Sequence, residues 1–140
     1  MRFYYIILFA LLISCQQKTS SVDAPQFTDS SNKVFFKNLK TGDTLVSPFI
    51  IEMGVIGMKI KPAGMLEAGT GHHHLIIDQG FMDYGKIIPM DKEHIHYGKG
   101  DTLAEVDLPS GQHTLTLQFA NGMHASYGEQ FSNTISVYIK

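Results

Sequence analysis

The sequence is poor in cysteine and in charge, and each shortage excludes a class of protein. Its single cysteine, Cys15, has no partner for an intramolecular disulfide, so disulfides cannot hold this domain together. Charged residues make up 17% of the chain and the formal net charge is −2, whereas a nucleic-acid-binding domain needs a basic patch or stripe. We therefore expect no nucleic-acid partner. The 140 residues allow one folded domain.

Long apolar runs are also scarce, and the most prominent one begins the chain. Arg2 precedes an apolar run, residues 3–13, which is too short to span a membrane and has the length of a signal-peptide core. The run ends in Leu-Ile-Ser-Cys, which resembles the lipobox of bacterial lipoproteins, where the cysteine is lipidated. We predict a signal peptide over residues 1–14 and a lipid on Cys15. The membrane would then be a partner, and the protein would lie at the bacterial cell envelope, on the outer membrane or facing the periplasm.

The segment after the cysteine lacks the pattern of a folded element. Residues 16–33 are rich in Ser, Thr, Gln and Asp and show no periodicity. We predict that residues 15–33 are the lipidated cysteine and a flexible tether, and that residues 34–140 form the folded domain.

An amphipathic helix of ten residues is not found in that domain, where the apolar pattern has a period of two instead. Such alternation is typical of half-buried strands, and Gly-rich or Pro-rich turn signals separate the strands. Many short strands joined in this way predict an all-β, immunoglobulin-like antiparallel β-sandwich. The alternating stretches are 49–55, 102–108, 113–119 and 134–140, and the turn signals lie at 41–43, 62–64, 98–100 and 109–111.

Histidine, by contrast, is abundant, and all seven histidines lie between residues 72 and 124. On a strand, residues at i and i+2 share a face, so each of the segments HHH (72–74) and HIH (94–96) can present two imidazoles to one ion. Imidazole nitrogens suit zinc and copper. We predict a zinc or copper site with His72, His74, His94 and His96 as core ligands, and with His113 and His124 as additional or supporting residues.

Two other interpretations compete with the metal site. The histidines can instead form a network of neutral imidazoles that holds loops together, in an adhesion or scaffold domain that binds an envelope protein or a glycan. Tyr84, Tyr97 and Tyr127 are the aromatic candidates for glycan contact. A metal-dependent enzyme ranks third, because the HExxH, GxSxG and phosphate-loop motifs are absent and no catalytic residues stand out.

The motifs also resemble a family, an uncharacterised group of small bacterial envelope domains. The stretches GMKIKPAG, GTGHHHLIID, HIHYGKGDT and LPSGQHTLTL, followed by His124, are similar to that family's pattern in the same order. Asn121 and Tyr127 depart from it, since the family has an aspartate and a second loop histidine at these places. The resemblance implies secretion and a shared fold, and it implies no activity. Its motif residues are Gly71, His72, His73, His74, Asp78, His94, His96, Gly98, Gly100, His113, Thr114 and His124.

Overall fold

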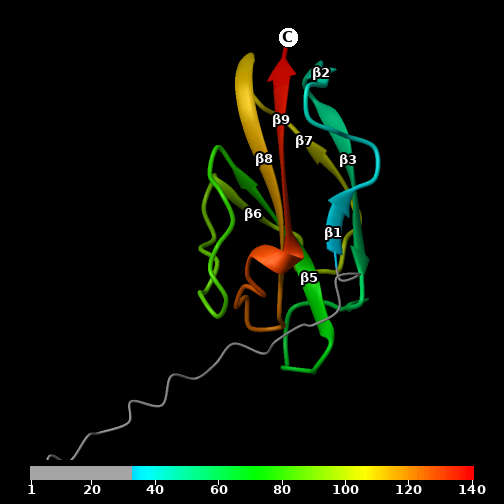
Figure 1. Cartoon of the computed structure of the whole chain (residues 1–140), viewed down its shortest axis with the longest axis vertical. Coiled ribbons are helices and arrows are strands. Elements are labelled where there is room, and N and C mark those ends of the chain that lie inside the picture. Colours follow the sequence, from blue (N-terminus) through cyan, green and yellow to red (C-terminus); the bar gives the residue numbers. More distant parts are fainter. Residues whose placement is uncertain (1–32) are drawn as a thin grey trace, which may run out of the picture.

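The computed structural model describes residues 33–140, so the predicted signal peptide, Cys15 and nearly all of the tether lie outside the described residues. The expected all-β sandwich is confirmed (Figure 1). Within the described part, the only helical element is a short 3-10 turn, and no helix has the length and apolar character needed to cross a membrane. The elements are β1 (Lys33–Phe36), β2 (Thr44–Leu45), β3 (Phe49–Ile56), β4 (Lys59–Ile60), β5 (Thr70–Ile77), β6 (His94–His96), β7 (Leu103–Val106), β8 (Gly111–Ala120), η1 (Glu129–Phe131) and β9 (Ser132–Ile139).

Two sheets make up the sandwich. The smaller one has the order β1-β3-β7, and the larger one has the order β2-β9-β8-β5-β4, with β6 also paired to β5. The long pairs β8–β9 and β5–β8 are antiparallel, whereas the two-residue pairs β2–β9 and β4–β5 are parallel. The outer edge of β5 is therefore shared by two short strands, β4 near its start and β6 near its end.

The alternating pattern of the sequence matches the burial of the strands. In β3, Phe49, Ile51 and Met53 are buried, while Ile50 between them is exposed. Strand β3 begins directly after Pro48, a position where a missing backbone N–H is tolerated. The apolar faces of the two sheets meet in one core, which includes Phe36, Phe49, Ile51, Met53, Leu75, Ile77, Val106, Leu115, Leu117, Phe119, Ile135, Val137 and Ile139.

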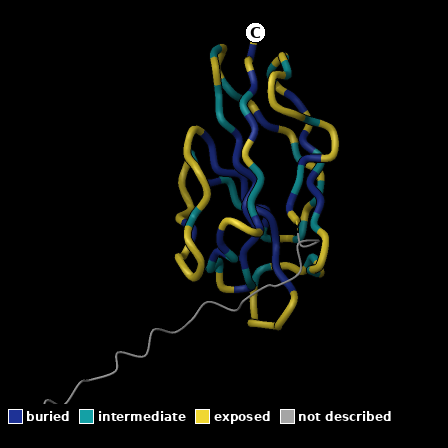
Figure 2. The backbone as a smooth tube through the Cα atoms, viewed as in Figure 1, coloured by how far each residue is buried: buried dark blue, intermediate teal, exposed yellow. Residues whose placement is uncertain are grey.

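Strand β5 is buried on both faces, and so is the second half of its neighbour β8, residues 115–120 (Figure 2). One face packs into the sandwich core through Leu75 and Ile77. The opposite face carries His72 and His74. Segments 78–93 and 121–128 cover that face of the sheet. An isolated bridge pairs Ile87 with Ala125, so these two segments are joined to each other. His72 and His74 are therefore shielded from solvent.

Candidate metal centre

Strand pairing brings three histidines together on the outer face of the large sheet. His72 and His74 share that face because they are two residues apart on β5. Strand β6 pairs antiparallel with β5 in a register that sets His96 directly opposite His74. The rings of His74 and His96 are stacked, with centroids 5.0 Å apart, and the ring of His72 lies 4.9 Å from each of them.

The ring nitrogens of these three residues converge. His72 Nε2 lies 3.1 Å from His74 Nε2 and 3.1 Å from His96 Nε2. One ligand nitrogen from each residue lies within 4.8 Å of the other two. A tetrahedral zinc site with Zn–N bonds of 2.0–2.1 Å has nitrogens about 3.3 Å apart. The two Nε2 separations are close to that spacing, so the three side chains could hold a single ion.

His124 joins this group from a loop and not from a strand. Its Nε2 lies 3.2 Å from His96 Nε2, and its ring centroid is 4.6 Å from that of His96 and 5.1 Å from that of His72. The backbone at His124 has a φ of 65°, in the left-handed region that non-glycine residues seldom adopt. The Asn121 side chain braces the turn, because its Oδ1 accepts hydrogen bonds from the backbone N–H groups on both sides of His124.

The surroundings disfavour protonation of His72, His74 and His96. Burial, reinforced by neighbouring histidines, lowers the pKa of His72 from its usual 6.5 to about 4 and that of His74 to about 2. Burial and the nearby His124 also lower the pKa of His96. A metal ligand must be deprotonated, so the lone pairs that an ion needs are present at neutral pH.

Hydrogen bonds between the histidine rings do not fully explain the short Nε2–Nε2 distances. A neutral imidazole nitrogen carries either one hydrogen or one lone pair. The contacts run in a chain from His74 to His72 to His96 to His124, so the two central nitrogens would each have to share one hydrogen or one lone pair between two partners. A cation instead accepts one lone pair from each nitrogen. The converging nitrogens of His72, His74 and His96 could therefore hold a cation.

Two of the predicted ligands lie elsewhere. His94 is on β6, opposite Ile76, and its Nδ1 lies 2.7 Å from Asp91 Oδ1. His113, on β8, has Nδ1 2.9 Å from Asp78 Oδ2 and Nε2 3.0 Å from the carbonyl oxygen of Pro109. Both rings therefore have local partners. His113 ties the start of β8 to the end of β5, a structural role.

His73 points the opposite way, as the strand alternation predicts. Its ring meets the edge of Phe119 in the sandwich core, with centroids 5.0 Å apart. Neither of its ring nitrogens has a hydrogen-bond partner among the described residues. Burial, together with nearby positive charge, lowers the pKa of His73 to about 4.

The tyrosines considered for glycan contact form no exposed aromatic surface together. Tyr97 is buried in the core, and Tyr127 packs beside Phe119 and donates its hydroxyl hydrogen to the carbonyl oxygen of Thr70. Tyr84 is the exposed member of the three. Tyr127 stands where the family pattern has a second loop histidine, and here that position contributes to packing.

Gly98 is one of the motif residues, and the sequence alone indicated no role for it. If the register of β5 and β6 is continued, Gly98 falls opposite His72, and the His96 ring lies over its Cα: a Cβ placed there would be 2.1 Å from His96 Cε1. The function of Asn121 was missed in the same way. The only signal in the sequence was the position of each residue two or three places from a histidine.

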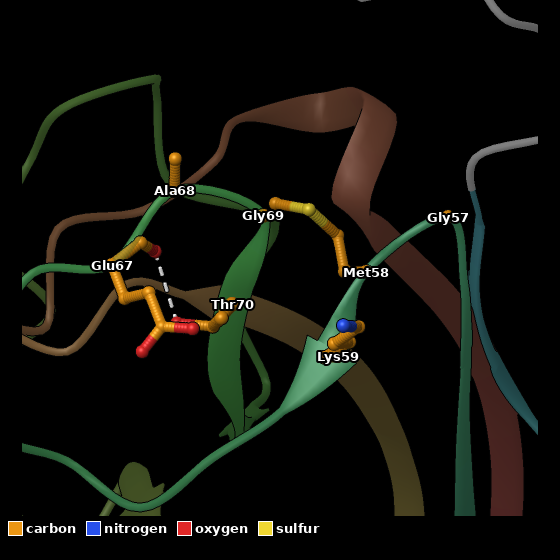
Figure 3. A pocket seen from close by; sticks show the side chains of 7 residues that line it. All are labelled: Gly57, Met58, Lys59, Glu67, Ala68, Gly69 and Thr70. Atoms are coloured by element: carbon orange, nitrogen blue, oxygen red, sulfur yellow. Dashed lines mark hydrogen bonds between the residues drawn. The ribbon is translucent and has the colours of Figure 1, made fainter.

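An open pocket at the start of β5 adds no ligand to this group (Figure 3). Its lining contains no histidine, and the close-up shows Thr70 donating its hydroxyl hydrogen to the backbone oxygen of Glu67. The lining residues are Gly57, Met58, Lys59, Glu67, Ala68, Gly69 and Thr70.

The comparisons with known proteins identify a family. A family model described as a domain of unknown function (DUF4399) matches residues 51–140, from β3 to the end of the chain. The chain belongs to the DUF4399 family. The expectation of an uncharacterised family is thereby confirmed, and the correspondence of the individual motifs stays a prediction. All seven histidines lie within the DUF4399 match. No curated protein and no solved structure matches the chain.

Proposed function

We propose that this DUF4399 protein binds a zinc or copper ion through His72, His74 and His96, with His124 as the fourth ligand. The observation that carries the proposal is that ring nitrogens of His72, His74 and His96 lie within 4.8 Å of one another, with His124 Nε2 3.2 Å from His96 Nε2. Burial also lowers the pKa of His72 and His74, so both rings are neutral at neutral pH. Four imidazole ligands would leave no coordination position for a substrate, so metal binding or handling fits better than metal-dependent catalysis.

The rigidity of the ligands supports the same proposal. His72, His74 and His96 belong to paired strands and are held by the hydrogen bonds of the sheet. His72 Nδ1 and His74 Nδ1 have no hydrogen-bond partner among the described residues, so packing, and not a supporting carboxylate, orients these rings. His124 comes from a loop and would provide the fourth ligand.

Titration of the purified full chain, carrying no histidine tag, with Zn(II) or Co(II) tests this function. We expect one ion per chain, and we expect a His96→Gln, His124→Gln double variant to lose binding. Both side chains are half-buried and lie at the edge of the cluster, so the fold should survive their replacement. His113→Gln is the matched control and should bind as the parent does, because His113 is engaged by Asp78. If the double variant bound metal as tightly as the parent, the histidines would be structural.

We further propose that Cys15 anchors the protein by lipid at the bacterial cell envelope. The support is the apolar run that ends in Leu-Ile-Ser-Cys. Stable anchoring takes more than one acyl chain, and a cysteine that carries several would provide it. Cys15→Ser should abolish labelling by a radioactive fatty acid and release the protein from membranes. Membrane partitioning equal to that of the parent would contradict the anchor.

A further inference from the structure

The histidine cluster faces solvent on the side of His96 and His124. His72 and His74 are fully buried, whereas His96 and His124 are half-buried. A surface hollow opens beside His96. An ion that enters from solvent therefore passes His96 and His124 before it reaches the two buried ligands.

The loop after β4 borders this entrance on the His124 side. The backbone N–H of Gly64 donates a hydrogen bond of 2.9 Å to the carbonyl oxygen of Gly122. The contact is so close that a Cβ on Gly122 would lie 2.5 Å from the backbone oxygen of Met65. Met65 is thus held against the chain that leads into His124.

The same loop borders the entrance on the His96 side. The backbone N–H of Ala63 donates a hydrogen bond of 2.8 Å to the carbonyl oxygen of Gly98, the glycine beneath the His96 ring. Residues 63–65 therefore connect the two chain segments that carry the half-buried histidines.

Two methionines stand at this junction and are exposed. The relative exposure of Met65 is 92% and that of Met123, which directly precedes His124, is 57%. Methionine is among the residue types most often buried, so two exposed methionines on contacting segments call for an explanation. A thioether is a soft ligand that selects Cu(I) over the harder divalent ions.

Building on the proposed function, we infer that Met65 and Met123 form an entry site at which their sulfurs bind Cu(I) before it moves to His124 and the strand-borne histidines. The copper enters and moves on as Cu(I), so no electron is gained or lost. The entry site gives the protein a preference for copper that four imidazoles alone do not provide.

Cu(I) uptake by the full chain tests this inference. The ion is presented under anaerobic conditions as a complex with a chromogenic chelator, and its transfer to the protein is followed by stopped-flow absorbance. A Met65→Leu, Met123→Leu double variant keeps the apolar volume and removes the sulfurs. We expect its uptake to slow by about tenfold, the lower end of what supporting groups at metal sites typically contribute. Met90→Leu is the matched control, because Met90 is also exposed, at 78%, and should leave the rate unchanged.

X-ray absorption provides a second readout. The parent loaded with two equivalents of Cu(I) should show a copper–sulfur shell, and the double variant should not. Equal uptake rates, or a parent without a sulfur shell, would overturn the entry site even if Zn(II) binds as proposed. A parent that binds neither Zn(II) nor Cu(I) would overturn the proposed function and the entry site together.

Discussion

At the scale of single residues, the missing side chain of Gly98 makes room for the His96 imidazole. An added methyl group would lie 2.1 Å from His96 Cε1 and 2.3 Å from its Nε2, distances that non-bonded atoms do not tolerate. Gly98 is not among the glycines with positive φ, so alanine meets no backbone strain there. An alanine at this position would therefore displace the His96 ring and leave the backbone unstrained.

Gly98→Ala should weaken metal binding by roughly 100-fold, the upper end of the effect seen for residues that support ligands, and leave the fold intact. The affinity comes from Zn(II) titration and the fold from circular dichroism. Gly80→Ala is the matched control, since a Cβ at Gly80 meets no atom within 4 Å. A Gly98→Ala variant with parental affinity would show that the His96 ring does not need its present position.

At the scale of elements, the sequence predicted the strands and the face that His72 shares with His74, because both follow from an alternation of period two. It could not predict the register between β5 and β6. That register sets His96 opposite His74 and places His94 two residues farther along, opposite Ile76. The local alternation of apolar and polar residues does not show which residues of two strands about twenty residues apart face each other. Both His94 and His96 were therefore predicted to be ligands.

The sequence also did not predict that segment 78–93 packs over the outer face of β5. Segment 78–93 has no alternation, yet Ile88 is buried within it and its backbone N–H donates a hydrogen bond to the carbonyl oxygen of His124. Burial of this face is what lowers the pKa of His72 and His74. The chemistry of the site depends on loop packing that only the folded structure shows.

The turn at residues 121–125 positions His124, the proposed fourth ligand. Asn121 Oδ1 accepts the N–H groups of Met123 and Ala125, at 2.9 and 3.1 Å. Asn121→Ala removes this acceptor and should reduce metal affinity by about tenfold, because His124 is then less well positioned. Asn121→Asp keeps an acceptor oxygen and should retain most of the affinity. Calorimetric titration measures the metal affinity of the two variants. An equal loss of affinity in both would argue against a positioning role for Asn121.

At the scale of the whole molecule, buried histidines make stability depend on pH. His73 has a pKa lowered from its usual 6.5 to about 4, chiefly by burial. Above pH 6.5 both the folded and the unfolded state are neutral at this residue, and stability does not change. Between pH 6.5 and 4 the unfolded state binds a proton that the folded state does not, so stability falls as pH falls. The full loss is about 3 kcal/mol for such a residue, and His72 and His74 add to it.

Replacement of this core histidine should therefore reduce acid sensitivity. We expect the free energy of unfolding of the metal-free parent to fall markedly from pH 7 to pH 5, and that of His73→Leu to fall by less. Urea unfolding in the presence of a chelator measures both differences. A His73→Leu variant whose stability falls as much as that of the parent would mean that the other histidines carry the whole effect.

The outer edge of β5 gives the proposed metal site a consequence for self-association. That edge is covered by two residues of β4 and three of β6, so a small opening of β6 would leave backbone N–H and C=O groups of a central strand unpaired. Such an edge recruits strands from other chains. The proposed ion, held jointly by His74 and His96, would fasten β6 to β5. Metal-free protein should therefore associate faster than metal-loaded protein, and light scattering of the two compares their rates. Release of the ion would then allow the exposed edge of β5 in one copy of the protein to pair with a strand of another copy.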